Sequence, residues 1–311
     1  MSQQTVPNYG GQAVIEGVMF GGKTVTVTAV RTKNQEIEYF EAPRTEYTWV
    51  KPLKKIPILR GLVGLIEASA NGAKHLNFAS ERYSMDSDEE VTESPSKLTL
   101  ILGVAVVGVL SFLFGKFVFT LVPVFLADFL LGKWVPDGTP QTIAEGIIKI
   151  ILLLAYITAI AQAPIIKRLF QYHGAEHKVI NAFEKGLELT VKNVQSTSTL
   201  HYRCGSSFLI FSVIVGVVIY SLFDYQSLTE RVVQRIVLLP LVIGVSYEVL
   251  QITNKLRDIP VLRYLGYPGL WLQKITTREP DDSQVEVAIA SFLKMRELDE
   301  KHVQEKMATT G

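Results

Sequence analysis

Long apolar runs and polar segments alternate along this chain. Four stretches, at 98–120, 146–166, 205–223 and 232–252, consist mostly of aliphatic and aromatic residues and hold few charged side chains. A helix needs about 20 such residues to cross the hydrocarbon core of a bilayer. The pattern predicts an α-helical multi-pass membrane protein with four transmembrane helices.

The first apolar run continues to residue 131, which makes it too long for one straight crossing and too short for two. Lys116 interrupts the run and Pro123 follows soon after. We therefore assign 98–120 to the span and 121–131 to a helix lying at the outer membrane face. A re-entrant segment is the alternative.

Lys and Arg are unevenly distributed between these runs. They are frequent before the first span, in segment 167–204 and after residue 252, whereas 132–145 and 224–231 hold one basic residue each. Basic residues collect in cytoplasmic loops. We expect a plasma-membrane protein with both termini and segment 167–204 in the cytoplasm.

The N-terminal segment 1–55 shows the pattern of a small β-meander. Alternating apolar and polar residues flank Gly21-Gly22, which is typical of a hairpin. EIEYFE at 36–41 and TEYTWV at 45–50 could add strands. So small a sheet rarely stands alone, and we expect it to pack on another part of the chain.

Helical periodicity marks the other polar parts of the chain. Segment 56–83 predicts an amphipathic helix whose apolar face includes Ile66, and the acidic, Ser-rich segment 84–97 predicts a solvated linker. Segment 253–311 predicts C-terminal cytoplasmic helices, with Asp282 in the first turn of the last one.

The pattern H-x-x-E-H follows the second predicted span and consists of His173, Glu176 and His177. On a helix the two histidines are one turn apart and can direct two imidazoles at one metal ion. Glu176 lies beside them, where it could take a proton from a bound water.

Further ligands are available near this motif. His201 and Cys204 end the same polar segment, Glu184 lies on the motif face of the helix, and Glu248 lies near the cytoplasmic end of the last span. Four protein ligands would make a closed structural site, whereas three would leave a position for water. We expect His173, His177 and one further ligand to bind a divalent metal, zinc by its preference for this ligand mix. The third ligand stays open among these candidates.

Plainer interpretations compete with a metal site. A five-residue match of this kind is often a set of solvent-facing polar residues, and Cys204 could be a small buried residue. His75 is expected to be an ordinary residue of its helix face. Glu16 lies among apolar residues, either as a strand residue facing solvent, which we favour, or as a buried acid paired with Arg60.

Composition excludes some classes of function. The chain has 48% hydrophobic and 20% charged residues and a formal net charge of +1. No basic stretch alternates with aromatic residues, so we expect no nucleic-acid partner. Cys204 is the single cysteine, which excludes an intramolecular disulfide.

Several motifs together resemble one known family. GGQAVIEGVMF, YHGAEHK, HYRCGSSF and the C-terminal PGLWLQKITTREPDDSQVEVAI are similar to the YqhQ family of bacterial membrane proteins, and the resemblance extends over nearly the whole chain. That family is catalogued as a domain of unknown function and as predicted metal-dependent enzymes. The resemblance implies membrane location and a metal-dependent activity, although the second implication rests on the same histidines.

The sequence therefore predicts a metal-dependent enzyme, a hydrolase, with its site at the cytoplasmic membrane surface. Its substrate would be a lipid-linked molecule or a membrane-bound peptide. The rival is a non-catalytic scaffold or assembly factor, in which a structural zinc could hold segment 167–204 together. A transporter fits less well, since the predicted spans hold few charges and no paired broken helices.

Overall fold

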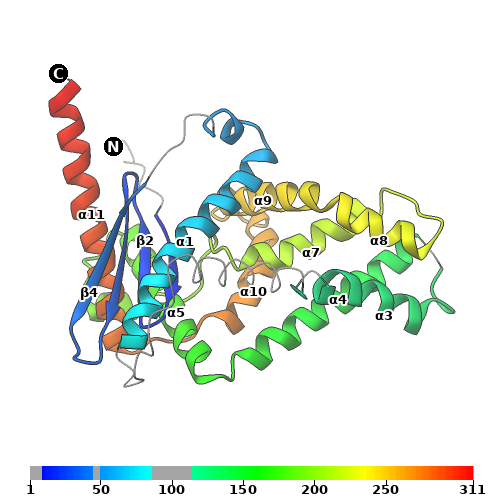
Figure 1. Ribbon diagram of the computed structural model, residues 1–311, viewed down its shortest axis with the longest axis horizontal. Coiled ribbons are helices and arrows are strands. Elements are labelled where there is room, and N and C mark those ends of the chain that lie inside the picture. Colours follow the sequence, from blue (N-terminus) through cyan, green and yellow to red (C-terminus); the bar gives the residue numbers. More distant parts are fainter. Residues whose placement is uncertain (1–8, 45–49, 86–113, 116, 137, 311) are drawn as a thin grey trace, which may run out of the picture.

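The computed structural model describes residues 9–44, 50–85, 114–115, 117–136 and 138–310. The chain is mostly helical and carries a small antiparallel sheet near its N-terminus. In Figure 1 the sheet and α11 (Asp282–Thr310) lie at one end of the molecule, and α3 (Val122–Leu131), α4 (Thr139–Ile160) and α8 (Leu228–Val237) lie at the other. The remaining helical elements are η1 (Leu53–Lys55), α1 (Leu59–Met85), η2 (Phe117–Leu121), α5 (Pro164–Glu184), α6 (Val191–Gln195), α7 (Ser207–Tyr220), α9 (Leu239–Lys255), η3 (Leu262–Gly266) and α10 (Tyr267–Thr276).

The sheet is a four-stranded meander, as expected from the alternating pattern. Its strands are β1 (Gly10–Val14), β2 (Gly17–Gly21), β3 (Val25–Arg31) and β4 (Ile37–Pro43), in the order β1-β2-β3-β4. The hairpin at Gly21-Gly22 is present, and the Gly22 N–H donates to the Val25 carbonyl at 2.8 Å. The segment before it forms two strands rather than one because the chain turns at Glu16, whose φ is +53°. The strand expected at 45–50 falls mainly outside the described residues.

Both faces of the sheet are covered by helices, which confirms that the meander packs on the rest of the chain. Val27 lies in an apolar core with residues of α5 and α11, including Phe292. On the opposite face, Thr26 and Thr28 are hydrogen-bonded to His75 of α1. His75 is a residue of the helix face, as expected, and that face is fully buried against the sheet.

Helix α1 confirms the predicted helix but not its predicted buried face. Ile66 is 68% exposed, whereas the buried positions include Gly61, His75 and Ala79. A Cβ at Gly61 would lie 2.6 Å from the Tyr247 Cβ. Helix α1 packs through its small residues because they allow its backbone to approach α9 closely. The periodicity of apolar residues does not indicate where such close packing occurs. Most of the predicted linker 84–97 lies outside the described residues.

Helix α11 confirms the predicted C-terminal helix and its acidic start. The Asp281 carboxylate accepts a hydrogen bond from the Gln284 N–H at 2.9 Å, which caps the helix. Ser291 donates to the Val18 carbonyl at 2.8 Å and so ties α11 to the sheet.

Within the described ranges, α4 is the one unbroken helix long and apolar enough to cross a membrane by length and composition. It begins before the predicted span 146–166 and ends at Ile160, because a turn precedes Pro164. The predicted span 205–223 corresponds to α7, a shorter helix of 14 residues. The predicted span 232–252 is bent by 52° between α8 and α9 and would count as a second span only if the bent pair is taken as one.

The other membrane predictions concern the first apolar run. Predicted span 98–120 lies largely outside the described residues. The helix predicted at 121–131 is present as α3, which packs against α4.

A buried ion cluster joins α4 to α8. Glu145 accepts hydrogen bonds from Arg231 at 3.0 Å and Arg235 at 2.8 Å, and both guanidinium side chains are almost completely buried. Sequence patterns did not predict this cluster, since Arg231 stands as the one basic residue of the short segment 224–231.

Candidate metal centre

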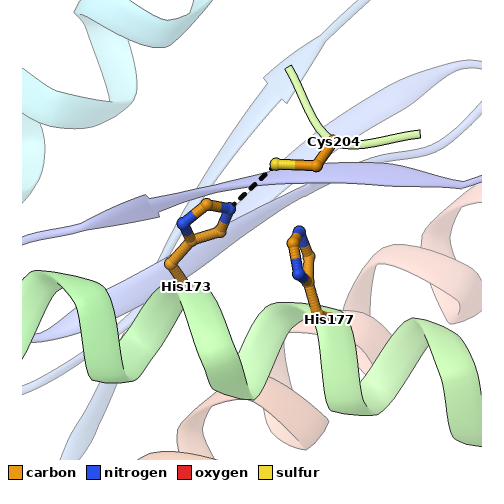
Figure 2. Close-up of side chains that lie close together, drawn as sticks. All are labelled: His173, His177 and Cys204. Atoms are coloured by element: carbon orange, nitrogen blue, oxygen red, sulfur yellow. Dashed lines mark hydrogen bonds between the residues drawn. The ribbon is translucent and has the colours of Figure 1, made fainter. Parts of the chain in front are cut away.

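Helix α5 carries His173 and His177 one turn apart, as the motif predicts. Figure 2 shows both rings on the side of the helix that faces Cys204. The His173 Nε2 atom lies 3.2 Å from the Cys204 Sγ atom. One ligand atom from each of the three residues lies within 4.8 Å of the other two.

The second nitrogen of each imidazole is held by a backbone carbonyl. His173 Nδ1 donates to the Thr276 carbonyl at 2.8 Å, and His177 Nδ1 donates to the Thr199 carbonyl at 2.6 Å. These bonds place the proton on Nδ1 and leave each Nε2 with a free lone pair. The same arrangement orients metal-binding histidines in known sites.

The carbonyl that holds His177 is itself fixed by α5. Lys178 is buried, and its ammonium donates to the Gln195 and Thr197 carbonyls at 2.9 and 2.8 Å. Asn181 donates to the Ser198 carbonyl at 2.7 Å. Residues 195–200 are thereby bound to the helix that presents the motif.

Close approach of α5 to the segment after α10 positions His173. Gly174 faces the Arg278 carbonyl oxygen so closely that a Cβ would overlap it. The Arg278 N–H donates to the Phe170 carbonyl at 2.9 Å. The absence of a side chain at Gly174 therefore allows the Thr276 carbonyl to reach His173.

Cys204 lies in surroundings that favour the thiolate. Ser206 provides an N–H 3.4 Å and a hydroxyl oxygen 3.0 Å from the sulfur. Burial opposes ionisation, but the N–H and hydroxyl of Ser206 stabilise the thiolate, and the pKa of the thiol is lowered. A thiolate is the form that binds metals.

Glu176 is 6% exposed and turns toward β1. Burial raises the pKa of its carboxyl to about 8, although the His173 ring and the Gly11 N–H, which donates to the carboxylate, favour ionisation. A Cβ at Gly11 would lie 3.0 Å from the Glu176 carboxyl carbon. A carboxyl group with a pKa near neutrality can both accept and release a proton.

His201 and Glu184 lie next to this cluster without joining it. The His201 ring is 5.7 Å from the His177 ring between centroids. Its Nδ1 accepts the Arg203 N–H at 3.3 Å, and its Nε2 faces Glu184 at 3.6 Å. Glu184 also pairs with Arg203 and Arg257, and despite burial these partners lower its pKa to about 2. The structure brings Cys204, not His201 or Glu184, into reach of both motif histidines.

The other two acidic candidates have different partners from those expected. Glu248 pairs with Arg60 and accepts the Ile58 N–H at 3.1 Å, so it faces α1 and does not reach the histidines. Glu16 pairs with Arg168 at 2.6 Å rather than facing solvent or pairing with Arg60. Sequence order gave no information about these long-range pairs.

A cavity of about 620 Å³ opens beside the cluster. Its walls are α5 with His173, Glu176 and His177, the loop 203–206, strand residues 9–13 and residues Gln251 and Asn254 of α9. Sequence reasoning missed the contribution of β1 to this cavity. The adjacent glycines, Gly10 and Gly11, were the available signal, because they allow close approach of backbone to a site.

The three converging side chains fit a zinc ion. Two imidazoles and one thiolate are ligands that zinc prefers, and three protein ligands leave the fourth tetrahedral position for water or substrate. The carbonyl partners of both rings complete the orientation such a site requires.

Comparison with known proteins gives one family and one curated relative. Residues 56–298 match the model described as "Protein of unknown function (DUF1385)". The chain is 56% identical over 305 residues to a protein of Bacillus subtilis (strain 168) described as "Uncharacterized protein YqhQ", and the alignment covers 96% of each chain. No solved structure matches the chain.

Proposed function

Because this chain belongs to the DUF1385 family of bacterial proteins, which is described only as being of unknown function, we propose its activity from the geometry of its site. We propose a membrane-embedded, zinc-dependent hydrolase. His173, His177 and Cys204 hold the ion, and Glu176 transfers the proton.

The convergence of three ligand atoms within 4.8 Å is the observation that carries this proposal. It is supported by the carbonyl bonds to both Nδ1 atoms, since these prepare the Nε2 lone pairs for a cation. The adjacent cavity gives a substrate access to the cluster.

The residues divide the work of hydrolysis. His173, His177 and Cys204 would hold a zinc ion, which would supply acidification of a bound water and polarisation of a carbonyl or phosphoryl oxygen. Glu176 accepts the proton that the water loses and delivers it to the leaving group. The buried surroundings of Glu176 keep its proton affinity in the range that both transfers require.

Zinc content of single variants tests the ligand set. The purified full-length protein should bind about one zinc per chain, and His173→Ala, His177→Ala and Cys204→Ala should each lose most of it. His201→Ala is the matched control, because it removes a nearby buried imidazole that the proposal leaves out. Retention of zinc in the three ligand variants, or its loss only in His201→Ala, contradicts the assignment.

Glu176→Gln separates catalysis from a structural zinc. The isosteric amide should leave zinc content unchanged and abolish the ability of the gene to restore growth fitness in a strain that lacks it. A scaffold whose zinc only holds the 167–204 segment would tolerate Glu176→Gln and fail on His173→Ala. That second pattern would refute the enzyme and favour the scaffold.

We also propose several membrane crossings with both termini and the site on the cytoplasmic side. Ile147 and Ile151 of α4 and Val218 of α7 are more than half exposed, which suits helices in contact with lipid. The uneven distribution of Lys and Arg supports the orientation. Alkaline phosphatase fused after Tyr225 should be active, whereas the same enzyme fused to the C-terminus should not; the reverse pattern would refute the orientation.

A further inference from the structure

Helix α10 turns two different faces to its surroundings. The turn η3 continues into α10 without a break, because Gly266 and Tyr267 both have helical backbone angles. Tyr264 and Trp271 are 51% and 62% exposed. They lie seven positions apart, which is close to two helical turns and places both on one face. The buried residues on the other face of η3 and α10 are Gly266, Gly269, Leu272, Gln273 and Thr276.

The inner, buried face of α10 helps to hold the candidate metal centre in place. The Thr276 carbonyl accepts the hydrogen bond from His173 Nδ1 at 2.8 Å. The Gln273 side-chain amide bonds to both backbone groups of His201 at 2.8 Å, in the loop that leads to Cys204. A contact on the outer face of α10 is therefore separated from the metal ligands only by the thickness of this helix.

The outer face has the composition of a membrane–water interface. Tyr264, Tyr267 and Trp271 follow one another at spacings of three and four residues. The two tyrosine rings meet at 4.8 Å between centroids, and the Arg263 guanidinium lies over the Tyr264 ring at 5.2 Å. Trp and Tyr are enriched where a bilayer meets water, and basic side chains extend from such positions to the lipid headgroups.

Aliphatic and basic residues extend this face toward α9. Val261 is 73% exposed, and Ile259 and Leu265 are also exposed. Segment 255–274 holds four basic residues and one acidic residue. Exposed apolar side chains among basic ones complement the acyl chains and the phosphates of an anionic lipid surface.

The position of η3 along the chain selects the bilayer as its partner. Six residues, 256–261, separate α9 from η3. This connection is folded, since the Ile259 N–H donates to the Leu256 carbonyl at 3.1 Å. Helix α9 crosses the membrane in the proposed topology, so η3 lies at the cytoplasmic end of that crossing. In Figure 1, α10 runs across the direction of α7 and α9, which is the orientation of a helix in the membrane plane.

We infer that η3 and α10 lie in the cytoplasmic interface of the bilayer, with Tyr264, Tyr267 and Trp271 among the lipid headgroups. The inference rests on the proposed membrane crossings and does not depend on hydrolysis. A helix with its side chains is about 10 Å across, so the candidate metal centre lies about that far from the headgroup layer. A substrate anchored in the same leaflet is within reach of the site.

Trp271 is a native probe of this contact. The chain has three tryptophans, and the double substitution Trp49→Phe, Trp134→Phe leaves Trp271 as the single one. The full-length variant is reconstituted into phosphatidylcholine–phosphatidylglycerol vesicles. The lipids carry bromine, which quenches tryptophan on contact, either close to the headgroup or close to the end of the acyl chain. Trp271 should lose most of its emission to the shallow bromine, less to the deep bromine and little to iodide in the water.

Two reporters in a variant without native tryptophans calibrate the measurement. Ile151→Trp lies on the exposed side of α4 near its middle, and deep bromine should quench it most. Asn34→Trp lies in the exposed turn between β3 and β4, and iodide but not brominated lipid should quench it. Tyr264→Trp in the same background should repeat the shallow pattern of Trp271, because both residues lie on one face.

The outcomes separate the inference from the proposed membrane crossings. Quenching of Trp271 by iodide alone, by neither agent, or more by deep than by shallow bromine would overturn the inference. Quenching of Ile151→Trp by deep bromine would show in each of these cases that the crossings survive. Lack of lipid quenching at both Trp271 and Ile151→Trp would instead remove the proposed crossings, and the inference with them. An aqueous or deep pattern for Tyr264→Trp would contradict a helix that lies flat.

Discussion

His75 should make the packing of α1 on the sheet depend on pH. Its Nε2–H donates to the Thr26 hydroxyl oxygen at 2.9 Å, which in turn donates to the Ala42 carbonyl at 3.2 Å. Its Nδ1 accepts from the Thr28 hydroxyl at 2.6 Å. The neutral ring satisfies both threonines. Burial, together with the charge of Lys74, lowers the pKa of His75 from 6.5 to about 4.

The sign and size of the effect follow from this shift. Since the folded pKa lies below the unfolded one, the unfolded chain binds more protons at intermediate pH. The contribution of the neutral ring is complete above about pH 6.5 and is lost as pH falls through about 4. The neutral His75 ring contributes about 3 kcal/mol in total to the free energy of unfolding, and about 2 kcal/mol of this is lost by pH 5.

Thermal unfolding of the detergent-solubilised protein, followed by circular dichroism between pH 7.5 and 5, measures the effect. His75→Gln is the comparison, because an amide can bond to both threonines without titrating. The Tm of wild type should fall by about 4 °C more than that of His75→Gln over this range. Parallel pH profiles would refute the assignment of a neutral, depressed-pKa histidine between α1 and the sheet.

The remaining predictions concern buried charge and close backbone approach. Glu145→Gln leaves two guanidinium groups buried without an anion and should lower the free energy of unfolding by about 3–5 kcal/mol. Arg231→Gln keeps the ion pair between Glu145 and Arg235 and should lower the free energy of unfolding by less. Equal losses of Tm in the two variants would contradict this account. Gly174→Ala should lower the free energy of unfolding by about 1–3 kcal/mol and reduce zinc occupancy, because the added Cβ would overlap the Arg278 carbonyl next to His173. Gly205→Ala, which meets nothing within 4 Å, should change neither Tm nor zinc content, and a loss there equal to that of Gly174→Ala would show that the site is sensitive to any added methyl group.

Local patterns in the sequence determined several elements of this protein. The Gly21-Gly22 hairpin, the C-terminal helix that begins at Asp282 and the one-turn spacing of His173 and His177 depend on residues within a few positions of one another. Periodicity and turn chemistry report such short-range geometry directly.

Long-range contacts decided what local patterns could not. The buried face of α1 follows from glycines that fit against α9, and the bend between α8 and α9 interrupts a continuous apolar run. For α1 and for the α8–α9 segment, the apolar pattern is compatible with more than one packing arrangement. The pattern shows which residues are apolar, but it does not show which distant residues they contact.

The candidate site shows the same division. His201 and Cys204 are only three residues apart in the chain, yet Cys204 faces the motif histidines and His201 faces Glu184. The loop that carries both is held by Gln273 of α10, which bonds to the His201 backbone N–H and carbonyl at 2.8 Å. The sequence by itself supplied two imidazoles and a carboxyl on one helix, and the tertiary structure selected the thiol and added strand β1 to the cavity wall, because both choices depend on contacts between segments far apart in the chain.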